Sequence, residues 1–454
     1  MKHFNIPKPL SELNEIFVKN NFHLYLVGGA VRDYLLGLKN NDYDFTTDAT
    51  PEEVSMMFPH STIPTGIKHG TVTVIFKKEL YEITTFRSEG DYLDSRHPSS
   101  VEFVRDLSTD LERRDFTINA LAVDLTTGEI IDYHNGIEDL NAKVIRAIGE
   151  PKQRFYEDGL RLLRACRFAA KLDFKIEENT FKAIVETREN IRPVSVERIK
   201  DELFSLLLSH HPKTGLEALR ETGLLDIILP EFVPMVGMEQ KGIHKYDVWN
   251  HTLACTEASV NLKFPQFVTL ASFFHDIGKT VTYKEIDGVA TFYNHEVEGE
   301  RLTKQILKRL KASNEEIDTI SHLVREHMFH YTPDWRDGAV RRFINRVGLN
   351  YIPMLFQLRI CDQIGITGEA DTTLIDELQK RIDKILAENC ALKLSDLNIN
   401  GKDLMTLSVK GKLIGLTLNY ILEQVIDDPS LNEKDKLLKL ASLYIENHSS
   451  KPNA

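Results

Sequence analysis

The chain has few cysteines, no long apolar run and no excess of positive charge. Its four cysteines, Cys166, Cys255, Cys361 and Cys390, lack paired spacing, which is typical of reduced thiols rather than of a disulfide framework. No apolar run reaches the roughly 18 residues of a membrane span, and the N-terminal MKHFNIPKPL lacks the pattern of a signal peptide. We therefore expect a cytoplasmic protein with no membrane partner.

The charge balance also narrows the class of protein. A net charge of −12 means that the overall composition does not announce a nucleic-acid partner, so such a partner would have to meet a local basic surface. The 454 residues and 42% hydrophobic content are enough for several domains with real cores. The composition leaves the oligomeric state open.

Secondary-structure patterns divide the chain into four regions. Strand-like runs alternate with short helices in residues 1–148, which indicates an α/β or α+β unit with a small mixed β-sheet. Helical periodicity replaces this pattern in residues 149–224 and 225–385, and the second of these is rich in His and Asp. A Gly-punctuated loop and further helix follow in residues 386–454. The fold class we predict is α+β.

The most informative segment is LYLVGGAVRDYLLGLKNNDYDF. Asp42 and Asp44 are one residue apart, so on a strand their carboxylates share a face and repel each other unless a divalent cation such as Mg²⁺ lies between them. Upstream, Gly28 and Gly29 predict a turn into a helix whose N-terminus offers N–H groups to phosphate. Together these features predict metal-assisted phosphoryl chemistry. The alternative is an ordinary strand-to-helix turn followed by a solvated acidic loop.

Two later segments add candidates to this site. Glu82 lies in the strand-like run LYEITTFR and would supply a third carboxylate, although an ordinary surface glutamate is the alternative. Arg113 and Arg114 in ERRDFTINALAVD would bind a triphosphate, because guanidinium matches phosphate geometry. Asp115 and Asn119 are four residues apart on a predicted helical face and would read a ribose or hold an arginine in place. Alone, this charged run also fits a solvated surface.

Four motifs occur in order between residues 24 and 170: GGAVRDYLLG with DYD, RRDFTINA, DYHNGIEDL with VIRAIG, and EDGLRLLRACRF. With these motifs the chain resembles the tRNA nucleotidyltransferase and poly(A) polymerase family, in its bacterial class II branch. The resemblance implies a head (1–148) with a five-stranded sheet, and a mostly helical neck (149–224), body (225–385) and tail (386–454). It also implies Mg²⁺-dependent addition of nucleotides from CTP and ATP to a tRNA 3′ end, with release of pyrophosphate and without a nucleic-acid template.

The motif EDGLRLLR suggests how bases are chosen. Asp158 and Arg161 are three residues apart on a predicted helix, so an acceptor and a donor are neighbours. Cytosine and adenine both present an amino donor beside a ring acceptor, whereas uracil and guanine reverse that order. The resemblance assigns base selection to Glu157, Asp158 and Arg161. Arg32 would hold the triphosphate together with Arg113 and Arg114, and Arg164 is a further nucleotide-binding candidate. The alternative is a surface salt bridge between Asp158 and Arg161.

The nucleotides that are added depend on a further segment. The polar stretch RSEGDYLDSRHPSSVEF (87–103) looks like the flexible loop of the family's CCA-adding and A-adding members, which disfavours an enzyme that adds only CC. We predict addition of C, C and A. An A-adding tRNA nucleotidyltransferase or a poly(A) polymerase is the alternative.

A second constellation of His and Asp residues lies in the helical region. Imidazole and carboxylate ligands suit a transition metal or Mg²⁺, and Lys279 in the same region could contact phosphate. The constellation resembles the HD phosphohydrolase superfamily, which implies an unidentified divalent metal and a second, hydrolase activity. One alternative is an inactive scaffold, and another is an HD nucleotide phosphohydrolase whose head only binds nucleotide. The matching residues are His251, His275, Asp276 and Asp362, with His295 and His327 as the extra histidines of two-metal members.

The last region offers an RNA-binding candidate. The run LSDLNINGKDLM resembles the class II tail. Lys402, Lys410 and Lys412 are candidates for contact with the RNA backbone. A solvated lysine face is the alternative.

Overall fold

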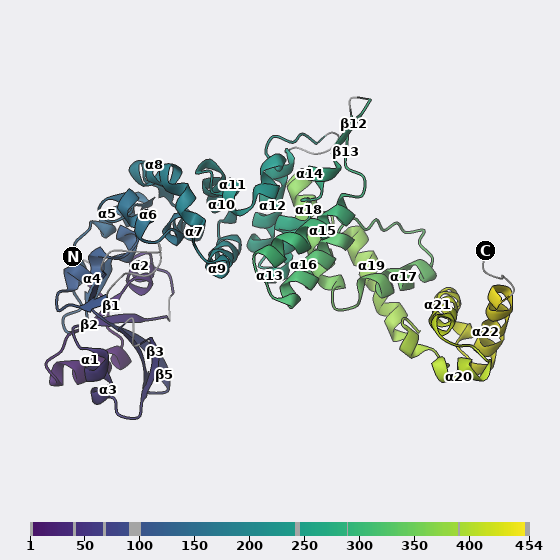
Figure 1. The fold of residues 1–454 in the computed structure, drawn as a ribbon, viewed down its shortest axis with the longest axis horizontal. Coiled ribbons are helices and arrows are strands. Elements are labelled where there is room, and N and C mark those ends of the chain that lie inside the picture. The colour runs from purple at the N-terminus through teal and green to yellow at the C-terminus, as the bar shows by residue number, and fades with distance from the viewer. Residues whose placement is uncertain are drawn as a thin grey trace. The chain divides into compact units, whose positions relative to one another are not determined.

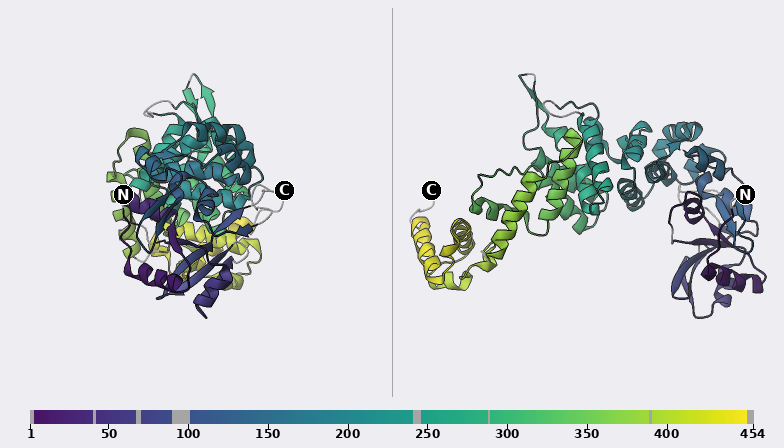
Figure 2. Two further views of the ribbon diagram at one scale, coloured as in Figure 1. Left: turned by 90° about the vertical axis from the view of Figure 1, so that its left-hand side faces the viewer. Right: turned by 180° about the vertical axis from the view of Figure 1, so that it is seen from behind.

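The computed structural model describes residues 3–39, 42–66, 70–89, 101–240, 246–287, 289–388 and 391–449. Its contacts divide the chain into two compact units. Unit 1 comprises Met1–Pro234 and Ile306–Ala312, and unit 2 comprises Met235–Gln305 and Ser313–Ala454. Figure 1 labels the elements of both units, and Figure 2 shows them from two further directions. Within the described ranges, no helix is both long and apolar enough to cross a membrane.

Unit 1 contains a mixed β-sheet with the strand order β3-β4-β5-β2-β1-β8-β9. The expectation of five strands is therefore wrong, because this sheet has seven. Four of the five central strands carry the apolar runs, and the fifth, β2, follows the Asp42–Asp44 motif. The two edge strands, with the sequences TIPTG and IID, are too short or too rich in Pro and Gly to be recognised. The strands of unit 1 are β1 Leu24–Val27, β2 Asp44–Thr47, β3 Thr62–Gly66, β4 Thr71–Phe76, β5 Glu79–Thr85, β6 Arg87–Glu89, β7 Val101–Phe103, β8 Leu121–Asp124, β9 Ile130–Asp132, β10 Val144–Ile145 and β11 Lys175–Ile176.

The register of β1, β2 and β5 places Val27, Asp44 and Glu82 side by side across the sheet. Strand β2 pairs antiparallel with β1, with Val27 opposite Asp44, and parallel with β5, with Asp44 opposite Glu82. Strand β2 begins at Asp44, so the expectation that Asp42 lies on the same strand is wrong. Pairing stops there because the next residue of β1, Gly28, has a φ of 70° and turns the chain into α2.

The rest of unit 1 consists of helices and two small two-stranded sheets, β6–β7 and β10–β11. The strands β6 and β7 pair antiparallel at the two ends of the predicted flexible loop, and residues 90–100 between them lie outside the described residues. The α-helices are α1 Lys8–Lys19, α2 Gly29–Leu35, α3 Pro51–Met57, α4 Leu107–Glu112, α5 Gly136–Ala142, α6 Pro151–Glu157, α7 Leu160–Leu172, α8 Glu178–Thr187, α9 Val196–Leu207, α10 Pro212–Glu221 and α11 Leu225–Ile228, and the 3₁₀ helices are η2 Thr117–Asn119, η3 Arg188–Ile191 and η4 Pro230–Met235.

The base-selection motif does not form one helix as expected. Helix α6 ends at Glu157, α7 begins at Leu160, and Asp158 between them is extended, with φ −140° and ψ 106°. The break follows from close packing: a Cβ atom on Gly159 would lie 1.9 Å from the carbonyl oxygen of Asn190. Glycine is also a weak helix former. The motif is therefore a junction between two helices.

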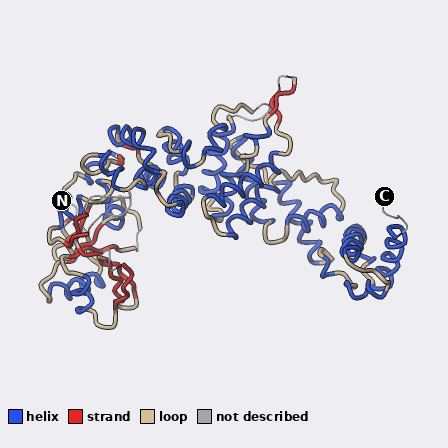
Figure 3. The backbone as a smooth tube through the Cα atoms, viewed as in Figure 1, coloured by secondary structure: helices blue, strands red, loops and turns tan. Residues whose placement is uncertain are grey.

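Unit 2 is helical apart from the β12–β13 hairpin, drawn in red in Figure 3, as far as its described residues extend. Its last part has an apolar core of its own, formed by residues such as Leu404, Ile421 and Leu437. Its elements are α12 Val248–Asn261, α13 Gln266–Phe274, α14 Lys279–Thr282, β12 Lys284–Ile286, β13 Val289–Thr291, α15 His295–Arg309, α16 Asn314–Glu326, α17 Asp337–Val347, α18 Ile352–Thr367, α19 Thr373–Ala387, η5 Leu394–Asp396, α20 Gly401–Thr406, α21 Lys412–Asp427, η6 Pro429–Leu431 and α22 Lys434–Ser449.

Candidate functional site

Three carboxylates gather at the edge of the head sheet. Asp44 on β2 lies opposite Glu82 on β5, and Asp42 precedes β2 by two positions. Burial raises the pKa of Asp44, and the charges of Asp42 and Glu82 raise it further, while Arg114 lowers it. These three negatively charged carboxylates form a site that a hard divalent cation would stabilise.

The two arginines of the RRD motif lie beside these carboxylates. Arg113 caps α4 and Arg114 follows it, and both pair with Asp110 in the same helix. A Cβ atom on Gly28 would lie 3.3 Å from Nη1 of Arg114, so the glycine leaves room for this guanidinium. Sequence reasoning missed Asp110. Its signal is an acid three and four residues before two arginines, the spacing of helical ion pairs.

The prediction that Asp115 and Asn119 share a helical face is wrong, because α4 ends at Glu112 and Asn119 lies in η2. They are nevertheless bonded: Nδ2 of Asn119 donates to Oδ1 of Asp115 at 3.0 Å. Each accepts from one arginine, Asn119 from Arg32 at 2.6 Å and Asp115 from Arg164 at 2.8 Å. Burial alone would raise the pKa of Asp115, but Arg164 and Asn119 lower it to about 2. This buried network fixes the orientation of both arginines.

The base-selection residues do not form the surface salt bridge that was the alternative to base selection. Nη1 of Arg161 donates to Oε2 of Glu157 at 2.6 Å, and its Nη2 donates to the carbonyl of Arg113 at 2.9 Å. Asp158 instead accepts from Nη2 of Arg198 at 2.7 Å. Arg198 lies 40 residues away on α9, and nothing in the local sequence indicates this contact. The Arg161 contact links the helix junction directly to the arginine motif.

The predicted His and Asp constellation comes together in unit 2. His251 lies on α12 and Asp362 on α18, while His275 and His327 follow the ends of α13 and α16. His295 begins α15. Donor atoms form two groups that could hold metal ions among the described residues. One group contains His251, Cys255, His275 and Asp362, and the other contains Asp276, His295 and His327.

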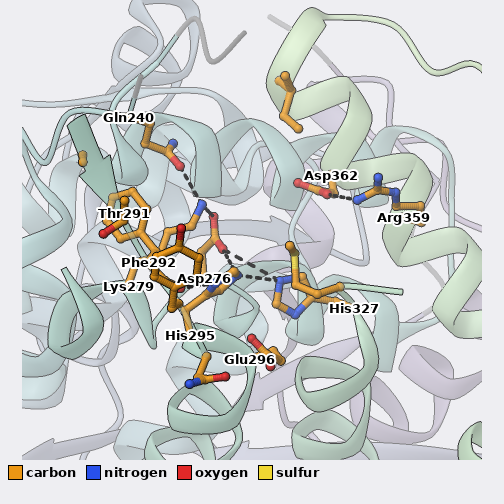
Figure 4. Close-up of a pocket in the computed structure, with 15 residues that line it drawn as sticks. Gln240, Asp276, Lys279, Thr291, Phe292, His295, Glu296, His327, Arg359 and Asp362 are labelled. Carbon is orange, nitrogen blue, oxygen red and sulfur yellow. Dashed lines mark hydrogen bonds and ion pairs between the residues drawn. The ribbon is translucent and has the colours of Figure 1, made fainter. Parts of the chain in front are cut away.

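The carboxylate of Asp276, in the same group as His295 and His327 (Figure 4), also lies close to the histidines of the other group. Its Oδ2 is 3.4 Å from Nε2 of His251 and 3.3 Å from Nε2 of His275. Its Oδ1 is 3.5 Å from Nε2 of His295 and 3.9 Å from Nε2 of His327. One carboxylate therefore faces imidazole nitrogens on both sides, which is the placement of a bridging ligand.

Backbone carbonyls orient three of these histidines. Nδ1 of His275, His295 and His327 lies 2.8, 2.9 and 2.6 Å from the carbonyl oxygens of the residues three positions earlier. A proton on Nδ1 leaves the lone pair of Nε2 free to bind a metal. Burial lowers the pKa of His327 to about 3, so this imidazole is neutral, as a ligand must be. Cys255, which sequence reasoning did not propose, lies beside His251, with Sγ 3.5 Å from its Nε2.

A cavity of about 590 Å³ opens beside this cluster. It is lined by Asp276, His327 and Asp362, and also by two cations, Lys279 and Arg359. Lys279 donates to Asp276 at 2.7 Å, and Arg359 donates to Asp362 at 3.0 Å. Sequence reasoning proposed Lys279 but missed Arg359. The cavity joins metal-binding groups to cations, so its chemistry suits a phosphoryl group.

The lysines proposed for RNA binding lie in the tail. Lys402 is the second residue of α20, Lys412 begins α21, and Lys410 lies between these helices. All three are exposed. Their role stays a prediction, as do the boundaries of the four sequence regions.

The mixed sheet with its acidic edge and paired arginines defines a nucleotidyltransferase of the poly(A) polymerase type. Residues 24–146 match the poly A polymerase head domain family, residues 173–235 the RNA and SrmB-binding site of polymerase A, and residues 289–441 tRNA nucleotidyltransferase domain 2. The CCA-adding enzyme of Enterococcus faecalis is 34% identical over 446 residues, which are 97% of this chain and 98% of the relative. The chain belongs to the family of CCA-adding enzymes.

Solved structures agree with this assignment. The CCA-adding enzyme of Bacillus stearothermophilus in complex with CTP is 27% identical, with a TM-score of 0.71 over 98% of this chain and 99% of that one. The Thermotoga maritima CCA-adding enzyme complexed with tRNA has a TM-score of 0.57 at 21% identity, over 98% of this chain and 100% of that one, and shows the fold alone. The predicted family and the α+β fold class are confirmed. The HD-type assignment of the body stays a prediction.

Proposed function

We propose that this chain adds C, C and A to the 3′ end of tRNA from CTP and ATP, with release of pyrophosphate. The observation that carries the proposal is the acidic edge of the head sheet beside Arg113 and Arg114, in a chain that matches CCA-adding enzymes over nearly its whole length. An A-adding enzyme or a poly(A) polymerase is disfavoured by the same relatives. A cytoplasmic location, where tRNA and both nucleotides are found, is part of this proposal.

Asp42, Asp44 and Glu82 would hold the catalytic cation. Their donors are all carboxylate oxygens, and the raised pKa of Asp44 reflects burial together with the negative charges of its two neighbours, which Arg114 offsets in part. These features fit a hard ion, and we propose Mg²⁺. When bound, such an ion supplies positive charge that lowers the pKa of the RNA 3′-hydroxyl and neutralises the leaving pyrophosphate.

The arginines and the helix junction would orient the nucleotide. Arg113 and Arg114 would bind the triphosphate through their fixed N–H donors, beside the turn at Gly28 and Gly29. Arg32 donates to Asn119, and Arg164 of α7 donates to Asp115. These bonds would fix the position of the arginine motif relative to α7.

Base selection would follow from paired acceptor and donor groups at the α6–α7 junction. Asp158 would accept from the amino group shared by cytosine and adenine, and Arg161 would donate to the adjacent ring nitrogen. Glu157 holds Arg161 in place at 2.6 Å, so the donor direction is set before the base arrives. Uracil and guanine would present a donor to the arginine and an acceptor to the aspartate, which leaves both unpaired.

Single-nucleotide extension tests this function. Purified protein would receive three tRNA substrates, ending before the tail, after the first C, or after CC, each with one NTP at a time. We expect CTP to extend the first two substrates and ATP to extend only the third. Extension of the third substrate by ATP without any incorporation of CTP would instead indicate an A-adding enzyme. Incorporation of ATP on all three substrates would indicate a poly(A) polymerase.

We propose a second function for unit 2, metal-dependent hydrolysis of a phosphate ester. The supporting observation is the convergence of four histidine Nε2 atoms on Asp276 beside a cavity with Lys279 and Arg359. The donors are imidazole nitrogens and carboxylate oxygens held by further hydrogen bonds, which fits one or two divalent transition ions or Mg²⁺. Bound metal supplies Lewis acidity toward a phosphoryl oxygen. Lys279 and Arg359 would hold the other phosphoryl oxygens.

Metal analysis and a hydrolysis panel test the second function. The full-length protein would be assayed against p-nitrophenyl phosphate, a nucleoside monophosphate and a 2′,3′-cyclic nucleotide across several divalent ions. We expect bound metal in excess of that held by the head, and hydrolysis of at least one substrate. If Asp276→Ala and wild type bind equal amounts of metal and neither hydrolyses any substrate, the cluster is a scaffold.

A further inference from the structure

One buried carboxylate in unit 1 has no part in the reaction as proposed. Asp110 lies on α4, and its side chain is 0% exposed. Leu107 and Leu111 of the same helix pack in one apolar cluster with Val27 of β1, so α4 lies against the sheet. A buried carboxylate is costly unless charged partners surround it. The contacts of Asp110 therefore explain its presence.

Both arginines of the RRD motif bind this carboxylate. Nε and Nη2 of Arg113 donate to Oδ1 at 3.0 and 2.8 Å, and Nη2 of Arg114 donates to Oδ2 at 3.3 Å. Burial alone would raise the pKa of Asp110, but the two arginines lower it below its ordinary value. The ionised carboxylate thus offsets the mutual repulsion of two adjacent guanidinium groups.

The same carboxylate also contacts β2, which carries Asp44, and the first residue of β6. The hydroxyl of Thr46 donates to the carbonyl of Thr84 at 3.0 Å and shares this proton with Oδ2 of Asp110 at 3.3 Å. The backbone N–H of Arg87 donates to Oδ1 at 3.4 Å. Thr46 lies two residues after Asp44 on β2, so the two side chains share a face of the strand. Asp110 is therefore tied to the strand that carries Asp44.

The hydrogen bonds to Asp110 leave part of each arginine side chain accessible to a ligand. The side chains of Arg113 and Arg114 are 17% and 19% exposed, although Asp110 itself is fully covered. A Cβ atom on Gly28 would lie 3.3 Å from Nη1 of Arg114, and Gly28 follows Val27, which lies opposite Asp44, so this guanidinium lies at the acidic edge. A guanidinium has five N–H donors, and Asp110 takes one of those of Arg114. The group can be held and still bind phosphate.

We infer that Asp110 is a positioning residue that sets Arg113 and Arg114 in fixed orientation against β2, so that they meet the triphosphate of either nucleotide. It acts through the arginines and does not touch substrate. The inference rests on the proposed nucleotidyl transfer, because it assigns the arginines to the triphosphate. Its effect is the same for CTP and ATP, since the triphosphate is common to both and the base is read at the α6–α7 junction.

A purely structural role is the competing explanation, and the chain offers a matched control. Asp139 on α5 is also buried, with a side chain 6% exposed, and it also binds an arginine and a threonine. It accepts from Nε of Arg146 at 3.1 Å and from the hydroxyl of Thr117 at 2.6 Å. Neither partner is assigned to the nucleotide site.

The test compares Asp110→Asn and Asp139→Asn in the full-length protein. Binding of inorganic tripolyphosphate is measured by calorimetry in the presence of Mg²⁺, and KM and kcat are measured for CTP and ATP on matching tRNA ends. Asp110→Asn should weaken tripolyphosphate binding and raise both KM values about tenfold or more, since one charged hydrogen-bonding partner is lost. Asp139→Asn should leave them near wild type, although both variants lower the unfolding temperature. Rejection of UTP should not change in either.

Asp110→Glu keeps the negative charge and moves the carboxylate by one methylene, so it should weaken tripolyphosphate binding less than Asp110→Asn does. If Asp110→Asn does not fold, Asp110→Glu replaces it as the test variant. Equal tripolyphosphate affinity in wild type and a folded Asp110 variant would overturn the inference. Failure of the proposed reaction is distinguishable, because it would show as a wild type that binds tripolyphosphate without adding nucleotides.

Discussion

At the scale of single residues, Asp44 carries the strongest physical argument for a cation. Burial, Asp42 and Glu82 all disfavour its charged form, and Arg114 offsets only part of this. The ionised form of such a residue lowers the stability of the metal-free protein, and a bound cation would stabilise it. A structural role would instead predict a paired, low-pKa carboxylate, as at Asp115.

We therefore predict that Asp44→Ala abolishes nucleotide addition and leaves folding intact, because it removes a cation ligand and relieves carboxylate repulsion. Addition should fall below about a tenth of wild type, with an unfolding temperature equal to or above that of wild type. Glu79→Ala is the control, since Glu79 is exposed on β5, the strand that also carries Glu82. Substantial addition by a folded Asp44→Ala protein would argue against the acidic edge as the catalytic site.

Base choice is a second residue-scale prediction. Asp158→Ala and Arg161→Ala should admit UTP and GTP more readily while changing tripolyphosphate affinity little. Each hydrogen bond at a base edge is worth about 1–3 kcal/mol, so discrimination should fall by roughly tenfold or more per substitution. The ratio of kcat/KM for CTP over UTP measures this. Unchanged rejection of UTP by both variants would refute the protein-template mechanism.

At the scale of elements, apolar runs were sufficient to predict the centre of the head sheet. Runs such as LYLV and TVTVIF became β1 and β4, and the register then placed Asp44 opposite Glu82. Edge strands and helix breaks were not predictable in this way. The break at Asp158 depends on the approach of η3 to Gly159, a contact between segments about 30 residues apart that no local pattern encodes.

That contact makes a prediction for the α6–α7 junction. Gly159→Ala would put a Cβ atom 1.9 Å from the carbonyl oxygen of Asn190, so the junction must shift. Asp158 and Arg161 would move with it, and both addition and rejection of UTP should decline. Gly415→Ala on α21 is the matched control, because a Cβ atom there meets nothing within 4 Å. Wild-type selectivity in Gly159→Ala would mean that the junction does not set base choice.

The motifs were sufficient to name candidate residues that the structure brings together, but not to predict how these residues pair, and their roles stay predictions. Sequence reasoning named both arginines and both His and Asp groups because short motifs carry them. It did not find Asp110, Arg198 or Arg359, whose roles arise from tertiary contacts with those motifs. Charged partners far apart in the chain become visible only when the elements pack.

At the scale of the whole molecule, the two constellations lie in different compact units. Asp42, Asp44 and Glu82 belong to unit 1, whereas His275 and Asp276 belong to unit 2. Each cluster draws its donors from its own unit. Nucleotide addition and phosphate-ester hydrolysis should therefore be separable.

A crossed pair of variants checks this separation. Asp276→Ala should lose metal and hydrolysis and retain nucleotide addition near wild type, and Asp44→Ala should show the reverse. Metal content by mass spectrometry accompanies both assays. Loss of nucleotide addition in a folded Asp276→Ala protein would mean that the two units act as one catalytic system.

The most direct test of the central claim is the sequence of the tail that the protein makes. A tRNA lacking its last three nucleotides would be incubated with wild-type protein and all four NTPs, and the 3′ ends of the products would be sequenced. The structure and its relatives predict a single product that ends in CCA, without U or G and without further extension. A lone A or a run of A residues on this substrate would contradict the account.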